Sequence, residues 1–188
     1  TGIHNTIGNL IESESLYKLA IETSLGAASN FLVVDNEAIT KECINYLKTN
    51  RIGRATFFPI NIIKEKNINP EDLLKIKNSN GFIDIASNLV KYDDLYEKII
   101  KNQLGNVVVV KDIDSLNEIG KILNYRYKIV SLEGEILYSG GSVQGGSAKA
   151  NNGLNDKAKL NEMTLKTEVL KIELDSLNKD YKEFNENY

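Results

Sequence analysis

The chain has 188 residues, a formal net charge of −3, one cysteine (Cys43) and one histidine (His4). This length allows one sizeable core with an appended element or two small lobes, and the shortage of Cys and His excludes a disulfide framework and a structural zinc site, which indicates a reducing compartment. The near-neutral charge argues against a surface that binds nucleic acid throughout, and no apolar run is long enough to predict a membrane span or a signal peptide.

The first part of the chain is repeated further along. An offset of 79 residues aligns positions 2 to 26 with a second stretch without a gap. Eight of these 25 positions are identical in the two copies: Gly2/Gly81, Asn9/Asn88, Leu10/Leu89, Leu16/Leu95, Tyr17/Tyr96, Ile21/Ile100, Leu25/Leu104 and Gly26/Gly105. An internal repeat of this kind predicts two lobes with the same fold.

Each copy predicts a short strand followed by an amphipathic helix. The apolar residues recur at helical spacing in both helices. They are Leu16, Leu19, Ala20, Ile21 and Leu25 in the first copy and Leu95, Ile99, Ile100 and Leu104 in the second. Gly26 and Gly105 follow the helices, where a left-handed C-terminal cap is expected.

A buried strand, a second helix and another strand then follow in each copy. The strands are predicted at 31–34 and 107–110, as continuous apolar runs that suit burial on both faces. The second helices are predicted over 36–49 and 115–123, with inward residues Ile39, Cys43, Ile44 and Leu47, and Leu116, Ile119 and Leu123. Strands at 54–58 and 127–132 complete two α/β lobes.

Residues 61–80 form a predicted connector with a short helix that Pro70 opens. After the second lobe, Glu133 and Gly134 predict a two-residue hairpin turn, from which the chain returns through 136–138. The predicted organisation is lobe I at 1–60, the connector at 61–80, lobe II with a glycine-rich motif at 81–150, and a C-terminal coiled-coil segment at 151–188.

The glycine-rich motif spans 140–147 and reads Gly-Gly-Ser-Val-Gln-Gly-Gly-Ser. It is not a phosphate-binding loop, because Gly146 and Ser147 stand where a lysine and a serine or threonine would follow the glycine. A flexible linker remains an alternative. The regular recurrence of Gly-Gly-Ser around Val143 favours a strand edge whose main chain another backbone can approach.

The C-terminal segment has apolar residues that alternate three and four apart over four heptads. These are Leu160, Met163, Thr167, Leu170, Leu174, Leu177, Tyr181, Phe184 and Tyr188. The pattern predicts a coiled-coil seam, and the alternative is an amphipathic helix packed on its own domain. A seam needs a facing helix, which would come from another chain or from sequence that precedes Thr1.

Nothing in the sequence predicts a catalytic, metal or cofactor site. His4 is isolated, Cys43 falls on the inward stripe of a helix, and the acid pairs at 93–94 and 112–114 suit helix capping. The densest basic cluster is Lys48, Arg51 and Arg54. A DNA-binding module that uses these residues with Lys149 and Lys157 is one alternative function, and a small-molecule-binding α/β protein with a glycine ligand loop is another.

Four ordered motifs carry a resemblance to a known family. They are 53–59 (Gly-Arg-Ala-Thr-Phe-Phe-Pro), Gly81-Phe82 leading to 86–92, Gly105 with Val107–Val110, and 140–147. Together they resemble the hinge domain of bacterial SMC (structural maintenance of chromosomes) proteins over residues 2–147. Two positions depart from the family pattern: Ser139 stands where a proline is common, and Asn5 where a glycine is common.

The resemblance implies a non-enzymatic homodimerisation hinge in which the lobes of two copies meet at sheet edges. It assigns the contact to Gly140, Gly141, Ser142, Val143, Gly145 and Gly146. It also implies an antiparallel coiled-coil helix before residue 1, a cut within a longer protein at Thr1, and ATPase heads elsewhere in that protein. The implied role is chromosome condensation and segregation in the cytoplasm, associated with the nucleoid, with weak or indirect contact to DNA.

Overall fold

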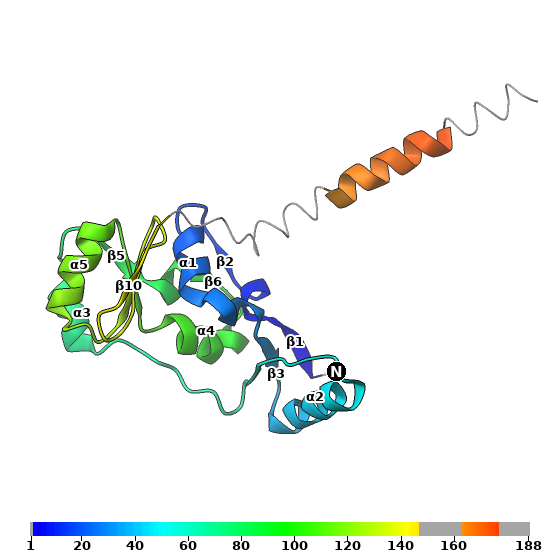
Figure 1. Cartoon of the computed structure of the whole chain (residues 1–188), viewed down its shortest axis with the longest axis horizontal. Helices are drawn as coiled ribbons and strands as arrows, with labels where there is room; N and C mark the ends of the chain where they lie inside the picture. Colours follow the sequence, from blue (N-terminus) through cyan, green and yellow to red (C-terminus); the bar gives the residue numbers. More distant parts are fainter. Residues whose placement is uncertain (1, 147–162, 177–188) are drawn as a thin grey trace, which may run out of the picture. The chain divides into compact units, whose positions relative to one another are not determined.

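The computed structural model describes residues 2–146 and 163–176 (Figure 1). The chain forms two compact units, Thr1–Ala150 and Asn151–Tyr188. The described part of the second unit is a helix over 163–176. Its predicted seam residues Met163, Leu170 and Leu174 are exposed. Three further apolar residues, which were not predicted for the seam, are exposed as well: Leu165, Val169 and Ile172. Of the other predicted residues, Leu160, Leu177, Tyr181, Phe184, Lys149 and Lys157 lie outside the described residues.

Lobe I is built on a three-stranded sheet of order β1-β3-β4, in which β1 is antiparallel and β4 parallel to β3. Its elements are β1 (Ile3–Thr6), η1 (Ile7–Asn9), β2 (Glu12–Ser13), α1 (Lys18–Leu25), η2 (Gly26–Asn30), β3 (Leu32–Val34), α2 (Glu37–Asn50) and β4 (Phe57–Pro59).

Lobe II is built on a five-stranded sheet of order β10-β9-β8-β7-β5. The elements after lobe I are α3 (Pro70–Ile76), β5 (Phe82–Ile85), η3 (Ala86–Leu89), β6 (Val90–Lys91), η4 (Asp94–Tyr96), α4 (Glu97–Leu104), β7 (Val107–Val110), α5 (Ile113–Ile122), β8 (Lys128–Ser131), β9 (Ile136–Leu137) and β10 (Val143–Gln144). Strand β5 is antiparallel and β8 parallel to β7, so these three strands repeat the lobe I sheet. The predicted mixed α/β class is confirmed.

The internal repeat is also present in the hydrogen bonds. The amide of Asp35 donates to the carbonyl of Gly2 at 3.0 Å, and the amide of Lys111 donates to the carbonyl of Gly81 at 2.8 Å. Both glycines have a positive φ, +94° and +76°. The N-caps correspond as well, because Asn36 accepts amides at the start of α2 and Asp112 does so at the start of α5.

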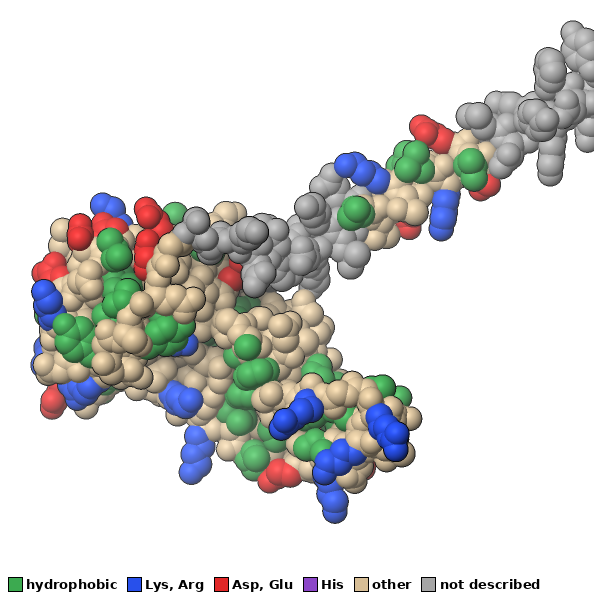
Figure 2. All heavy atoms as spheres, in the orientation of Figure 1, with side chains coloured by type: hydrophobic (Ala, Val, Ile, Leu, Met, Phe, Trp, Pro, Cys, Tyr) green, Lys and Arg blue, Asp and Glu red, His purple; other side chains and the backbone are tan. Residues whose placement is uncertain are grey.

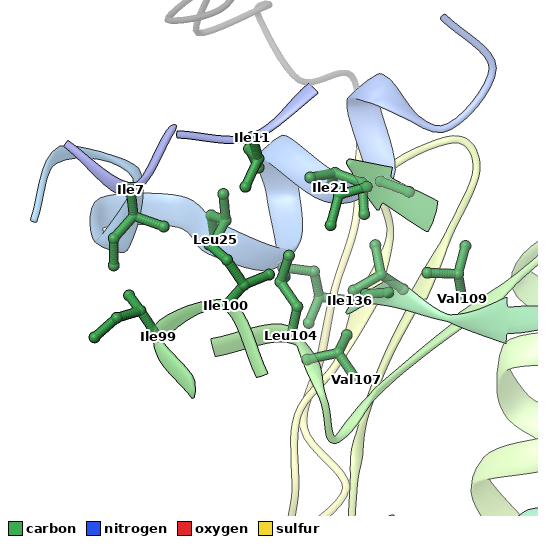
Figure 3. Packing of buried hydrophobic residues seen from close by; sticks show 14 of the residues in the cluster. Ile7, Ile11, Ile21, Leu25, Ile99, Ile100, Leu104, Val107, Val109 and Ile136 are labelled. Carbon is green, nitrogen blue, oxygen red and sulfur yellow. The ribbon is translucent and has the colours of Figure 1, made fainter. Parts of the chain in front are cut away.

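The two lobes share one hydrophobic core. Strand β2 of lobe I pairs with β6 of lobe II, and α1 and α4 face each other across the core (Figure 3). Ile21 and Leu25 of α1 are the repeat equivalents of Ile100 and Leu104 of α4, and all four are buried. Each such side chain contributes about 1.5–3 kcal/mol on burial. The lobes therefore pack through like surfaces around an approximate two-fold axis.

A second core belongs to lobe II and the segment that precedes it. Ile68 and Ile76 pack there with residues of β5, β7, α5, β8 and β9. Asp72 of α3 is buried, and its carboxylate accepts from Lys75 Nζ at 2.8 Å, Arg126 Nη2 at 2.7 Å and Tyr127 Oη at 3.0 Å. The hydrogen bond from Lys75 and, after it, Tyr127 and Arg126 lower the pKa of Asp72, against the opposing effect of desolvation. This network anchors α3 to lobe II.

Three details differ from the predictions. Leu16 and Leu95 precede their helices and are 60% and 52% exposed, and Ile44 of α2 is 37% exposed. Neither Gly26 nor Gly105 adopts the predicted left-handed helical cap, because Gly26 combines a φ of +50° with a ψ of −127° and Gly105 has the ordinary φ of −73°. Gly105 is required for a different reason, since a Cβ there would lie 2.3 Å from the carbonyl oxygen of Lys66. The connector backbone thus crosses directly over Gly105.

Candidate functional site

The predicted glycine-rich motif forms the far edge of the lobe II sheet. The turn between β8 and β9 consists of Leu132, Glu133 and Gly134. The amide of Ser131 donates to the carbonyl of Glu135 at 3.0 Å, so Glu135 already pairs with Ser131. The turn is therefore one residue longer than predicted. Strand β9 then pairs antiparallel with β10, with Val143 opposite Leu137. Strand β10 has β9 on one side and is the terminal strand of the sheet.

Backbone conformation explains three of the four glycines of the motif. Gly140 and Gly141 form the turn between β9 and β10 with φ of +95° and +97°, and Gly146 has a φ of +122°. No atom of the described residues lies within 4 Å of a Cβ placed at Gly140 or Gly146. Gly145 has no positive φ, and its Cβ would lie 3.0 Å from Cγ of Glu135. The repeating Gly-Gly-Ser pattern is therefore a turn and a strand exit around the two-residue strand β10.

The free edge of β10 is centred on Val143. The amide of Tyr138 donates to the carbonyl of Ser142 at 2.8 Å, so these residues form a hydrogen-bonded pair. Because such pairs alternate in an antiparallel ladder, the N–H and C=O of Val143 point away from β9. The Val143 side chain is 50% exposed. Strand β10 thus presents an apolar side chain and a main-chain edge that no strand within residues 2–146 pairs with.

Strand β4 forms a corresponding free edge in lobe I. The carbonyl of Thr56 accepts from the amide of Leu32, and the amide of Ile60 donates to the carbonyl of Val34, each at 2.9 Å. In a parallel pair, alternate residues of a strand bond to the same neighbour; Thr56 and Ile60 bond to β3, so the main-chain groups of Phe57 point away from β3. Within residues 2–146 no strand pairs with this side of β4.

Helix α2, which packs against β4, is much less buried than its repeat equivalent α5. Helix α5 buries Ser115, Leu116, Ile119 and Gly120, whereas α2 buries no residue. The difference arises because α3 and β9 pack on α5, whereas among the described residues α2 packs chiefly against β4. Apolar side chains therefore reach the surface at the α2 end of the unit (Figure 2). Those around α2 include Ile44, Tyr46 and Ile52, with exposed fractions of 37%, 63% and 57%.

The basic residues predicted as possible DNA contacts lie beside this edge. Lys48 is in the last turn of α2, and Arg51 is its C-cap with a left-handed φ of 52°. Arg54 lies in the exposed segment that leads to β4. These three side chains are exposed and close together in the chain.

The described residues contain no group of three or more His, Cys, Asp or Glu side chains that could hold a metal ion. His4 joins the lobes, with its Nε2 2.8 Å from Asp35 Oδ1 and its Nδ1 3.0 Å from Tyr96 Oη. Asp93 and Asp112 cap η4 and α5, as predicted, and the hydrogen bonds from Ser115 lower the pKa of Asp112. No helix over 2–146 or 163–176 is long and apolar enough to cross a membrane.

Two repeated α/β lobes with a shared core and a glycine-rich edge hairpin are the features of an SMC-type hinge. Residues 1–119 match the family described as "SMC proteins Flexible Hinge Domain", and the chain belongs to this family. The bacterial type is also confirmed, since the chain is similar to the chromosome partition protein Smc of Bacillus subtilis (strain 168), with 38% identity over 94% of this chain and 16% of the relative. With Smc of Mesomycoplasma hyorhinis the identity is 42% over 73% of this chain and 14% of the relative. The chain thus spans about one sixth of the length of these relatives.

Solved structures show the same fold. The crystal structure of an asymmetric dimer of the Geobacillus stearothermophilus SMC hinge domain matches with a TM-score of 0.78 and 40% identity, over 90% of this chain and 71% of that chain. The Pyrococcus furiosus SMC protein hinge domain matches with a TM-score of 0.66 and 32% identity, over 80% of this chain and 76% of that chain. Both comparisons show that the fold of this chain is that of solved SMC hinge domains.

Proposed function

We propose that this chain is the homodimerisation hinge of a bacterial SMC protein, and that β10 of one copy pairs with β4 of the other. One observation carries the proposal: lobe I ends at β4, at the position where lobe II adds β9 and β10 to the same three-stranded sheet. A partner's β10 would extend the lobe I sheet as β9 extends the lobe II sheet.

The physical chemistry of the two edges supports this pairing. An exposed strand edge has unpaired N–H and C=O groups that readily pair with another chain. Strand β10 and strand β4 both have such groups, at Val143 and Phe57. The apolar surface of α2 around Ile44 and Ile52 would be covered in the dimer, as α3 and β9 cover α5 within one chain. The asymmetric dimer of the Geobacillus hinge is consistent with association through this fold.

In the longer protein, the hinge would join two coiled-coil arms into a V or ring that entraps DNA. The helix over 163–176 would be one strand of an arm, paired with an antiparallel helix that precedes residue 1. Catalysis would belong to ATPase heads outside this segment, and the hinge would have a mechanical role without a cofactor. The protein would act in the cytoplasm on the nucleoid, where it condenses and segregates chromosomes.

DNA contact through Lys48, Arg51 and Arg54 is the second candidate function. Their exposure at one end of α2 supports a local phosphate-binding surface. We propose only weak or indirect DNA binding, because the net charge of the chain is −3. Fluorescence anisotropy with duplex DNA tests it: binding at physiological salt that disappears in the triple variant K48A/R51A/R54A would favour a direct role.

Proline at position 143 tests the edge pairing. Val143→Pro removes one N–H that points away from β9 and leaves the β9–β10 hydrogen bonds intact, because proline is tolerated on edge strands. The unpaired partner group costs about 1–3 kcal/mol, so the dimer Kd should rise about 5- to 150-fold.

Val143→Thr is the matched control, since it keeps the N–H and a β-branched shape. Analytical ultracentrifugation over a concentration series should show a folded V143P chain with this higher Kd and a V143T chain with the Kd of the wild type. A wild-type chain that is monomeric at micromolar concentration, or a V143P chain that dimerises as tightly as wild type, would refute the proposed interface.

A further inference from the structure

Tyr125 has a backbone conformation that is unusual for an aromatic residue. Asn124 and Tyr125 have φ values of +50° and +55°. The end of α5 explains Asn124, because the amide of Asn124 donates to the carbonyl of Lys121 at 3.1 Å and the amide of Tyr125 to that of Gly120 at 2.9 Å. This is the Schellman pattern, which needs a left-handed residue at the position of Asn124. It does not need one at Tyr125.

The left-handed conformation of Tyr125 directs its main chain to the glycine turn. Its carbonyl accepts from the amide of Gly140 at 2.8 Å. Among the hydrogen bonds between residues 2–146, this one joins the Gly140–Gly141 turn to an element outside the β9–β10 hairpin. The other bonds near the turn lie within the hairpin, from Gly141 to Tyr138 at 3.0 Å and from Tyr138 to Ser142 at 2.8 Å.

The ring of Tyr125 supports the same turn. A Cβ placed at Gly141 would lie 3.7 Å from Cγ and Cδ1 of the ring, and a Cβ placed at Gly120 would lie 3.5 Å from Cε1. The ring therefore occupies the space beside Gly141 and Gly120, where a side chain at either position would contact it. Tyr125 is still 38% exposed, so its conformation is not explained by burial in the core. Strained residues of this kind persist where the surrounding structure fixes them, and they are concentrated at functional sites.

We propose that Tyr125 is a positioning residue for dimerisation: it holds the Gly140–Gly141 turn so that β10 is presented to the second copy in its bound conformation. This inference rests on the proposed pairing through β10. Two consecutive glycines would otherwise leave the turn free to move, and ordering a loop on binding costs affinity. Tyr125 reduces this cost because the turn is already ordered in the free chain.

Two substitutions in the 188-residue chain test the role of the ring. Tyr125→Ala removes the ring contacts, and Tyr125→Phe keeps them and lacks only the hydroxyl. The dimer Kd should rise about tenfold or more in Y125A, since preorganisation is lost, and should change less than about threefold in Y125F. Equal Kd values for Y125A and wild type would overturn the inference.

A second measurement separates positioning from a general effect on stability. The Y125A change is placed in the V143P chain, and hydrogen exchange of the Gly140 and Gly141 amides is measured with the thermal midpoint of the unit. Positioning predicts faster exchange at the turn with an unchanged midpoint, whereas a lowered midpoint with uniform exchange would overturn it.

The two proposals fail in different ways. If V143P dissociates the dimer and Y125A does not, the role of Tyr125 is wrong and the β10 interface stands. If V143P leaves the dimer intact, the interface is wrong, and the positioning role that rests on it is wrong as well.

Discussion

Gly145 offers the sharpest test of the glycine motif as a contact surface. Substitution of Gly140, Gly141 or Gly146 would strain the backbone of the single chain, because each has a positive φ. Gly145 does not have this restriction. Among the residues that the structure describes, its Cβ would meet the side chain of Glu135, with Cγ at 3.0 Å and Cβ at 3.7 Å. Gly145→Ala is therefore the substitution in the motif that perturbs the monomer least.

The expected magnitude follows from these contacts. In the single chain, the Glu135 side chain has to shift by a few tenths of an ångström, and this is offset by the gain of about 0.4–1 kcal/mol from a less flexible unfolded chain. In the proposed dimer, a methyl group added where the end of β10 meets the second copy would act as overpacking, at about 1–3 kcal/mol for each contact. The dimer Kd of G145A should thus rise about 5- to 150-fold for one contact, and by the square of that factor if both contacts form.

Sedimentation equilibrium of the wild type, G145A, E135A and the double variant E135A/G145A measures this effect. Removal of the Glu135 side chain relieves the close contact that the new Cβ makes among residues 2–146, so a loss of dimer that persists in the double variant comes from the partner. If the double variant regains the Kd of E135A, the effect is internal to one chain. If G145A dimerises as tightly as wild type, Gly145 is not at the contact.

Two further predictions concern the frame that supports the edges. Gly105→Ala should destabilise the unit by about 1–3 kcal/mol, which lowers Tm by about 2–12 °C. The reason is that the new Cβ would lie 2.3 Å from the Lys66 carbonyl oxygen and 2.6 Å from that of Lys101. An unchanged Tm, measured by calorimetry at fixed protein concentration, would contradict the path of the connector over Gly105. Asp72→Asn should destabilise the unit at neutral pH. The pKa of Asp72 is lowered in the folded state, so its ionised carboxylate stabilises the fold above the unfolded pKa of about 3.9. This stabilisation is lost as the pH falls through the folded-state pKa. Urea unfolding of D72N and wild type should therefore differ at pH 7 and converge in acid, and a constant difference across this range would refute the ionic role.

The sequence predicts the parts of the fold that depend on local chemistry. The repeat at an offset of 79 residues predicts two like lobes, and the shared positions Ile21 and Ile100 are buried in their common core. Asp112 is recognisable as a cap because short acidic side chains accept the first amides of a helix. These features depend on residues close together in the chain or on identity between the copies.

Features that depend on tertiary packing were missed. Periodicity predicted an inward face for α2, but periodicity cannot show whether an element exists to cover that face. A comparison of the two copies indicates the exposure of α2. The residues after Leu132 form β9 and β10 in the second copy, and the first copy does not repeat them. Tyr125 had no signal, since tyrosine has no preference for positive φ. The reason for Gly105 depended on the path of the connector.

The way the two lobes pack also leaves strand edges that a second copy of the chain could pair with. Within one chain the lobes pack through equivalent faces of α1 and α4. Among residues 2–146 the two larger sheets end at β1 and β4 in lobe I and at β5 and β10 in lobe II, and the proposed dimer joins the unlike edges β4 and β10. Helices α2 and α5 lie at opposite ends of this unit, so β4 and β10 belong to opposite ends as well (Figure 1). Pairing of unlike edges between copies forms either a closed two-fold dimer or an open filament. A closed dimer contains both β4–β10 contacts, and the second forms within a complex that already exists, at a high effective concentration. In the proposed arrangement, closure would favour the dimer over the filament, and a ring that opened at one contact would keep its two arms joined by the other.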